Sequence, residues 1–102
     1  MPWEDAGPVE DLPVGRPMER WVGDHLVMLL RTGDGIAAAQ GHCPHKATAL
    51  LEGEYADGRV TCALHGACFD LVTGAPMPGQ EWAGRLQLYP VRLEAGRVKV
   101  LV

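Results

Sequence analysis

Glycine and proline interrupt this chain so often that no stretch of it is suited to a long helix. The 102 residues include 13 glycines and 8 prolines, which are scattered along the sequence rather than gathered in a linker. No window of helical length keeps apolar residues at helical spacing without a glycine or proline break. Short apolar segments separated by turn residues remain, and this pattern is typical of an all-β fold.

Several apolar segments pair up around tight-turn sequences. Residues 26–30 and 36–39 flank the turn sequence TGDG, DG precedes residues 59–61, and AG separates two alternating segments near the C-terminus. These patterns predict β-hairpins. We expect about eight to ten short, mostly antiparallel strands in a small sandwich or barrel-like packing. A chain of this length forms one domain, residues 1–102.

Cysteine and histidine residues are concentrated in two stretches that lack a strand pattern. Cys43 and His45 form a C-x-H box, and Cys62 and His65 form a C-x-x-H box, with sixteen residues between the boxes. We expect two functional loops, about residues 42–50 and 62–68, on a β-scaffold. Two metal centres match this ligand set. A structural zinc ion takes two cysteines and two histidines, and one type of 2Fe–2S cluster takes two cysteines on one iron and two histidines on the other.

The order of ligands within each box favours the cluster over zinc. Zinc knuckles usually pair two cysteines or two histidines close together in the sequence. Here each box offers one of each, which a binuclear cluster needs if each loop is to reach both irons. In that arrangement Cys43 and Cys62 hold one iron, and His45 and His65 hold the other. A zinc-stabilised interaction module stays open as an alternative of a different class.

Around these boxes the sequence resembles the Rieske ferredoxin family. The stretch CPHKATALLEG looks like the family's first cluster loop, and CALHGACFDLVTG looks like the second, including its F-D-x-x-T-G hairpin. The likeness extends to DLPVGRP near the start and LYPVRLEAGRVKV at the end, so it covers nearly the whole chain. The resemblance implies the Rieske fold, an antiparallel β-structure with a cluster-binding subdomain of two loops, and one 2Fe–2S cluster.

The resemblance also implies a function in electron transfer. Family members of about this length carry single electrons from an NAD(P)H-dependent flavoprotein reductase to a terminal Rieske non-haem iron oxygenase, through transient contacts. A small subunit of a nitrite reductase is the alternative. The chain itself is not expected to be an enzyme, because it has no G-x-G-x-x-G motif. Only His25 and His42 remain once the cluster is bound, and they form no convincing 2-His-1-carboxylate site for oxygen activation.

The residues beside the boxes predict a low reduction potential. High-potential relatives carry an extra cysteine in each loop, forming a disulfide, and a serine and a tyrosine that donate hydrogen bonds to the cluster sulfurs. Here the matching first-loop position is Thr48, so no such disulfide is possible, and the hydroxyl positions after His65 are Ala67 and Phe69, whose side chains donate nothing. We therefore expect a potential near the bottom of the Rieske range of about −150 to +300 mV.

Three nearby features have plainer interpretations. Cys68 is expected to be a small apolar residue on the strand that leaves the second loop, and His42 a surface residue of the first. Residues 75–79 read as a turn that could shield the cluster. The following QEWAG departs from the family pattern and leaves that shielding in doubt.

Charge and composition exclude several partner classes. The net charge is −4 and no basic patch is visible, so a nucleic-acid partner is not expected. No run of about 18 apolar residues exists to span a membrane. Three cysteines are too few for a disulfide scaffold, and no secretion signal is visible, so we expect a cytoplasmic protein.

Overall fold

The computed structural model describes residues 3–33, 35–44, 49–63 and 66–102. Within these ranges the chain forms ten strands and three short 3-10 turns, and no α-helix. The strands are β1 (Trp3–Pro8), β2 (Met18–Val22), β3 (His25–Thr32), β4 (Gly35–Gln40), β5 (Glu54–Ala56), β6 (Arg59–Thr61), β7 (Cys68–Asp70), β8 (Leu88–Tyr89), β9 (Val91–Glu94) and β10 (Arg97–Leu101). The turns are η1 (Val9–Asp11), η2 (Leu50–Glu52) and η3 (Glu81–Ala83). The all-β prediction is confirmed.

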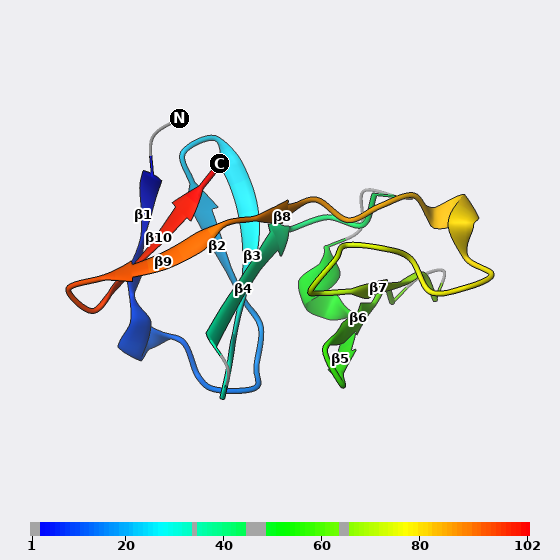
Figure 1. The fold of residues 1–102 in the computed structure, drawn as a ribbon, viewed down its shortest axis with the longest axis horizontal. Coiled ribbons are helices and arrows are strands. Elements are labelled where there is room, and N and C mark those ends of the chain that lie inside the picture. Colours follow the sequence, from blue (N-terminus) through cyan, green and yellow to red (C-terminus); the bar gives the residue numbers. More distant parts are fainter. Residues whose placement is uncertain (1–2, 34, 45–48, 64–65) are drawn as a thin grey trace.

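The strands form three antiparallel sheets. Their strand orders are β1-β10-β9, β2-β3-β4-β8 and β5-β6-β7. The first two sheets lie together at one end of an elongated molecule, and the small β5-β6-β7 sheet lies at the other end (Figure 1). The chain crosses to this small sheet after β4 and returns through β8 (Figure 1). In the described ranges no helix is long and apolar enough to cross a membrane.

Tight turns fix the register of the predicted hairpins. Asp57 and Gly58 join β5 to β6 with φ angles of 53° and 75°, and Ala95 and Gly96 join β9 to β10 with 51° and 79°. Two consecutive residues with positive φ twist the backbone in the sense that matches the flanking strands. The expected antiparallel pairs β3–β4, β5–β6 and β9–β10 are all present.

Strand β3 is buried on both of its faces. Successive side chains of a strand point to opposite sides, and the residues at positions 27–30 are each at most 2% exposed. Val27 and Leu29 join a hydrophobic cluster formed with β10, and Met28 and Leu30 join a second cluster toward the small sheet. Burying an aliphatic side chain fully is worth about 1.5–3 kcal/mol. This strand therefore holds the two ends of the molecule together.

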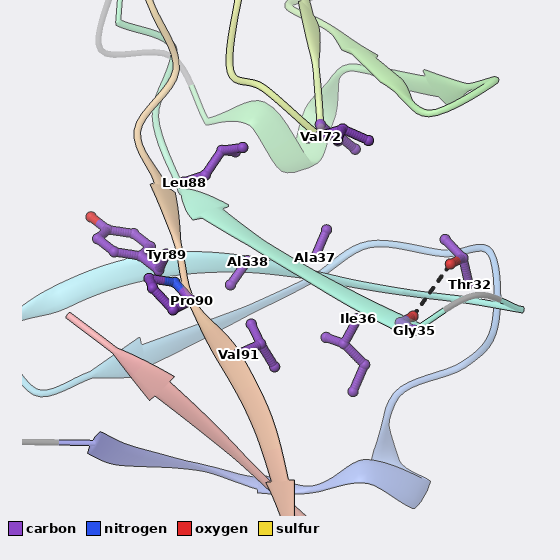
Figure 2. A pocket seen from close by; sticks show the side chains of 11 residues that line it. Thr32, Gly35, Ile36, Ala37, Ala38, Val72, Leu88, Tyr89, Pro90 and Val91 are labelled. Carbon is purple, nitrogen blue, oxygen red and sulfur yellow. Dashed lines mark hydrogen bonds between the residues drawn. The ribbon is translucent and has the colours of Figure 1, made fainter.

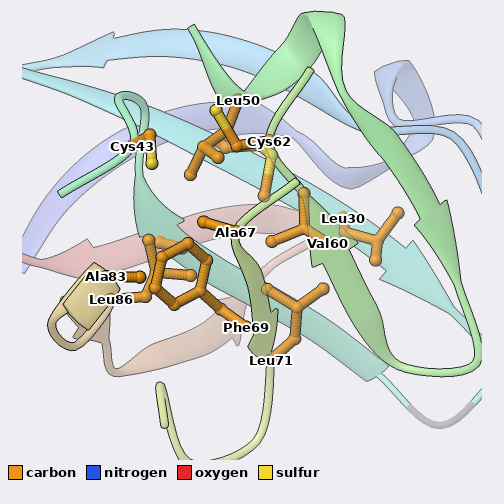
Figure 3. Packing of buried hydrophobic residues seen from close by; sticks show 12 residues of the cluster. Leu30, Cys43, Leu50, Val60, Cys62, Ala67, Phe69, Leu71, Ala83 and Leu86 are labelled. Carbon is orange, nitrogen blue, oxygen red and sulfur yellow. The ribbon is translucent and has the colours of Figure 1, made fainter. Parts of the chain in front are cut away.

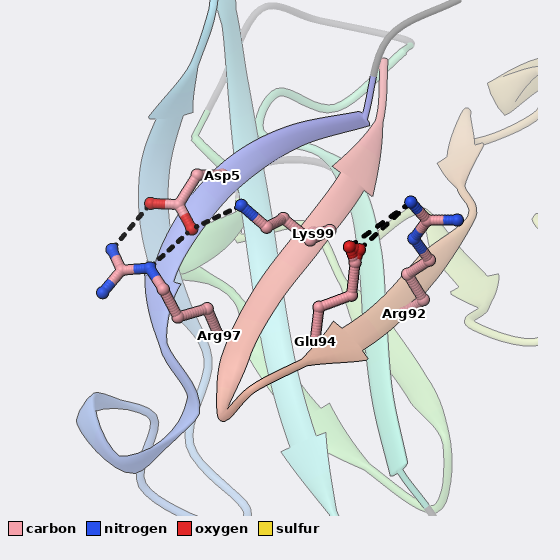
Figure 4. A network of polar contacts seen from close by, with 5 residues as sticks. All are labelled: Asp5, Arg92, Glu94, Arg97 and Lys99. Atoms are coloured by element: carbon pink, nitrogen blue, oxygen red, sulfur yellow. Dashed lines mark hydrogen bonds and ion pairs between the residues drawn. The ribbon is translucent and has the colours of Figure 1, made fainter.

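An ionic cluster fastens the two terminal strands to each other (Figure 4). Arg97 donates two hydrogen bonds, of 2.9 and 2.7 Å, to the two carboxylate oxygens of Asp5, and Lys99 lies 3.4 Å from the same carboxylate. The hydrogen bond from Arg97, assisted by Lys99, holds the pKa of Asp5 well below its ordinary value of 3.8. A bidentate pairing of this kind is stronger than a single surface ion pair.

The substitution Asp5→Asn is expected to lower the free energy of unfolding at pH 7. The native carboxyl has the lower pKa, so its contribution is complete above the unfolded pKa and is lost as the pH falls through the native pKa. The stability difference between the variant and the parent should be constant from pH 8 to about pH 4 and shrink below that. Denaturant titrations of both proteins across this range measure it.

Glu94→Gln serves as the matched control. Glu94 pairs with a single guanidinium nitrogen of Arg92, at 3.1 and 3.4 Å, on the same strand, and both side chains are about half exposed, so its replacement should change stability little. An effect of Asp5→Asn that is no larger than that of the control would contradict the role given to this cluster.

Candidate metal centre

The two ends of the first predicted loop lie next to each other in the fold. Cys43 follows the end of β4 by three residues. Before it, the Gly41 carbonyl accepts a hydrogen bond of 2.9 Å from the Leu50 amide, and His42 pairs with Ala49 in an isolated antiparallel bridge. These contacts close the base of the loop, so Cys43 lies just inside a fixed backbone junction.

A glutamine side chain ties this junction to the returning chain. The Gln40 side-chain amide donates a 2.8 Å hydrogen bond to the His42 carbonyl, and its oxygen accepts a 2.7 Å hydrogen bond from the Gln87 amide. The backbone amide of Gln40 also donates to the Gln87 carbonyl at 2.9 Å. The residue before Cys43 is thereby connected to the segment that leads into β8.

The second loop closes on Cys62 itself. The Cys62 amide donates a 2.7 Å hydrogen bond to the Ala67 carbonyl, and the Cys62 carbonyl accepts one of 3.2 Å from the Gly66 amide. Below the loop, Thr61 of β6 is paired with Cys68 of β7. The backbone of Cys62 is thus held by the sheet on one side and by the end of its own loop on the other.

The segment after β7 is more than the turn that the sequence predicts. Pro76 forms a bridge with Phe69, and the Met77 amide donates a 3.0 Å hydrogen bond to the Cys68 carbonyl, so this part runs along β7 as an added edge. The turn itself is confined to positions 78 and 79. From the end of the turn, the Gln80 side chain reaches back to the second loop.

The two loops bring both box cysteines into one apolar cluster. Cys43 and Cys62 are 3% and 2% exposed, both thiols are free, and both belong to the cluster that includes Leu50, Ala67 and Phe69. Figure 3 shows the two cysteines along one border of this cluster beside Leu50. The sequence predicts that these two residues act together, and the fold places them together.

The structure describes only some of the other residues that the sequence singles out. His45, His65 and Thr48 lie outside the described residues. Cys68 begins β7 and is half-buried, and His42 is exposed, as expected. Across the described ranges, no group of three or more His, Cys, Asp or Glu side chains converges. Neither His42 nor Cys68 therefore completes a metal site with the two buried cysteines.

A groove in the described part of the molecule is separate from this centre. Residues of β4, of β8 and of the turn after β7 surround a volume of about 480 Å³ (Figure 2). Its described lining is mainly aliphatic, and it includes Tyr89, whose hydroxyl pKa is raised by burial. No cysteine or histidine is among the described lining residues. The described metal-ligating side chains therefore lie at the cysteine loops and not in this groove.

The donor set at these loops fits an iron–sulfur cluster. Two unpaired thiols, each within an apolar cluster and each on a loop with a closed base, can bind one iron as thiolates shielded from water. The apolar side chains around them are the kind of surroundings that tune a cluster's potential.

Comparison with known proteins agrees with this assignment. Residues 2–90 match the family described as the Rieske 2Fe-2S domain. The anthranilate 1,2-dioxygenase ferredoxin subunit of Burkholderia cepacia is 33% identical over 98% of this chain and 92% of its own length. The ferredoxin of carbazole 1,9a-dioxygenase from Nocardioides aromaticivorans IC177 superposes with a TM-score of 0.86 at 26% identity, over 98% of this chain and 97% of that chain.

A structure described as a complex of reduced oxygenase and oxidized ferredoxin in carbazole 1,9a-dioxygenase gives a third match. One of its chains superposes with a TM-score of 0.83 at 26% identity, over 96% of this chain and 91% of that chain. The chain belongs to the Rieske 2Fe–2S domain family, and its cofactor is a 2Fe–2S cluster. The zinc alternative is thereby set aside.

Gly53→Ala is expected to disturb the second loop. A Cβ atom at position 53 would lie 2.0 Å from the Thr61 carbonyl oxygen, directly before Cys62. The backbone segments at Gly53 and Thr61 must move apart, which lowers the free energy of unfolding by about 1–3 kcal/mol. Denaturant titration of the cluster-loaded protein measures the cost, and loss of the visible absorption reports on the cluster.

Gly33→Ala is the control for this substitution. Gly33 has no heavy atom within 4 Å of an added Cβ, and its φ angle lies outside the left-handed region. It should leave both stability and cluster binding near those of the parent. If Gly53→Ala and Gly33→Ala show the same free energy of unfolding and the same visible absorption, the close approach of Gly53 to Thr61 is contradicted.

Proposed function

We propose that this chain is a one-electron carrier, the ferredoxin component of an oxygenase system. The observation that carries the proposal is the burial of two free cysteines, from two separate loops, in one cluster of a chain that belongs to the Rieske domain family. The anthranilate dioxygenase relative is named a ferredoxin subunit and matches nearly end to end. When bound, the cluster supplies one-electron redox chemistry.

Four residues are proposed to hold the cluster. Cys43 and Cys62 bind one iron through their thiolates, and His45 and His65 bind the other through imidazole nitrogens. The buried positions of both cysteines and the mixed C-x-H and C-x-x-H boxes support this division. Replacing two thiolates of an all-cysteine site by neutral imidazoles removes two negative charges, which makes an added electron easier to accept.

The proposed partners are a flavoprotein reductase that uses NAD(P)H and a terminal Rieske non-haem iron oxygenase. A complex of oxygenase and ferredoxin is known for the carbazole dioxygenase match, and transient contacts suit a carrier that must meet two proteins in turn. Catalysis then takes place on the oxygenase, and this chain is not itself an enzyme. A role as a nitrite reductase small subunit is the second candidate, and the dioxygenase ferredoxin relatives favour the first.

We place this carrier in the cytoplasm, where NAD(P)H-dependent reductases work and where free thiols stay reduced. Residues 1–102 are proposed to act as one domain. Support comes from β3, which contributes buried side chains to both hydrophobic clusters and so joins the two ends of the molecule.

The ligand assignment predicts the outcome of Cys→Ser substitutions. Cys43→Ser and Cys62→Ser should each reduce bound iron from about two atoms per chain to a small fraction of that, because a serine hydroxyl is a poor substitute for a thiolate. Iron and acid-labile sulfide analysis measures the loss. Cys68→Ser is the matched control and should retain the cluster, because Cys68 is half-buried on β7.

Electron paramagnetic resonance of the dithionite-reduced protein tests the mixed ligation. The average g value should lie below that of an all-cysteine cluster. An all-cysteine spectrum, or material that contains zinc and no iron, would overturn the proposed function.

A low reduction potential is expected for the cluster. Ala67 and Phe69 are both fully buried and carry no hydroxyl group, so their side chains cannot donate a hydrogen bond to a sulfur. Fewer donors to the sulfurs leave the reduced state less stabilised, and the midpoint should lie near the lower end of the range of about −150 to +300 mV. Redox titration gives the value, and a midpoint above roughly +100 mV would contradict this reasoning.

A further inference from the structure

We propose that Gln80 is a positioning residue for the cluster, holding the second loop through both atoms of its side-chain amide. This inference rests on the proposed function, because it concerns how the cluster loop is kept in place. Gln80 lies directly before η3, outside both Cys/His boxes.

The Gln80 amide bridges the two ends of one short backbone stretch. Its nitrogen donates a 3.0 Å hydrogen bond to the Gly66 carbonyl, and its oxygen accepts a 2.8 Å hydrogen bond from the Cys68 amide. Gly66 and Cys68 flank Ala67, whose carbonyl accepts the hydrogen bond from the Cys62 amide. Gln80 therefore holds both neighbours of the residue that binds the Cys62 backbone.

Gln80 affects Cys62 indirectly, through the backbone of residues 66–68. Gly66 also donates to the Cys62 carbonyl, so two backbone contacts of Cys62 depend on the stretch that Gln80 fixes. Gly66 itself has a φ angle of 70°, in the left-handed region where few other residues are stable. A side chain that supplies additional hydrogen bonds helps to hold the backbone in that conformation.

Gln40 has a related role at the first loop, where it ties the base of the loop to a different segment. Its amide donates to the His42 carbonyl, beside Cys43, and accepts from the Gln87 backbone amide. Each of the two loops is therefore held by one glutamine side chain. A primary amide suits this role because it carries a donor and an acceptor on one rigid plane, whereas a carboxylate only accepts.

Gln80→Met separates the hydrogen bonds from the side-chain volume, because methionine has nearly the same length and shape but no polar amide. In the cluster-loaded protein we expect release of iron to a chelator to be about tenfold faster than in the parent, the size expected for loss of ordinary hydrogen bonds. Hydrogen exchange at the Cys68 amide, followed by mass spectrometry, should speed up by a similar factor. The paramagnetic resonance lines of the reduced protein should broaden as the site samples more conformations.

Gln87→Met is the matched control. The Gln87 side chain donates only to the neighbouring Leu88 carbonyl among the contacts of the described residues, so its loss should leave iron release and the resonance lines within experimental error of the parent. Equal iron release in the Gln80→Met and Gln87→Met proteins would overturn the inference.

The substitution Gln80→Glu tests the two hydrogen bonds of the Gln80 side chain separately. A carboxylate still accepts from the Cys68 amide but repels the Gly66 carbonyl. Iron release should therefore be faster than in the parent while exchange at Cys68 stays slow. Should Gln80→Met fail to fold, this variant decides: unchanged iron release would refute the role of Gln80. A parent protein that takes up no cluster at all would instead refute the proposed function.

Discussion

The burial of β3 on both faces is the constraint on which the rest of the structure depends. Because its side chains alternate between two apolar clusters, this strand cannot shift its register by one residue without turning every buried residue to the wrong side. Met28 and Leu30 share their cluster with Cys43 and Cys62. The position of the cysteine loops is therefore coupled, through ordinary side-chain packing, to the sheets at the opposite end of the molecule.

Packing is not the only interaction that defines the two loops. Backbone hydrogen bonds, from Leu50 to Gly41 and from Cys62 to Ala67, close their bases. Glutamine amides from outside each loop add to these contacts. Apolar burial and polar closure thus have separate tasks: burial places the cysteines in a dry environment, and the hydrogen bonds set the course of the backbone on either side of them.

Much of this arrangement could be predicted from the sequence. The Asp57-Gly58 pair indicates its hairpin because aspartate and glycine tolerate positive φ angles better than most residues, and Gly96 marks the other turn for the same reason. The two boxes identify Cys43 and Cys62 because thiolates and imidazoles at such spacing have few other uses. These signals are local, and each requires only residue type and distance along the chain.

The contributions that escaped prediction are long-range and come from residues with no distinctive chemistry of their own. Gln80 acts on backbone atoms that are 12 to 14 positions away, and Gln40 accepts from an amide 47 positions away. Most surface glutamines face water, so nothing in the residue type marks these two. Residues 75–77 were expected to form a turn, and they pair with β7 because its outer edge has no other neighbour in its sheet.

The pairing of the first strand with the last has a consequence for how such a fold can be combined with others. Trp3 lies opposite Leu101 in the sheet, so the two ends of the chain leave the molecule side by side, away from β5–β7 (Figure 1). The connections to a preceding and a following polypeptide would therefore lie next to each other. If the unit is inserted into a host protein at these two adjacent ends, the end that holds the β5–β7 sheet faces away from the host.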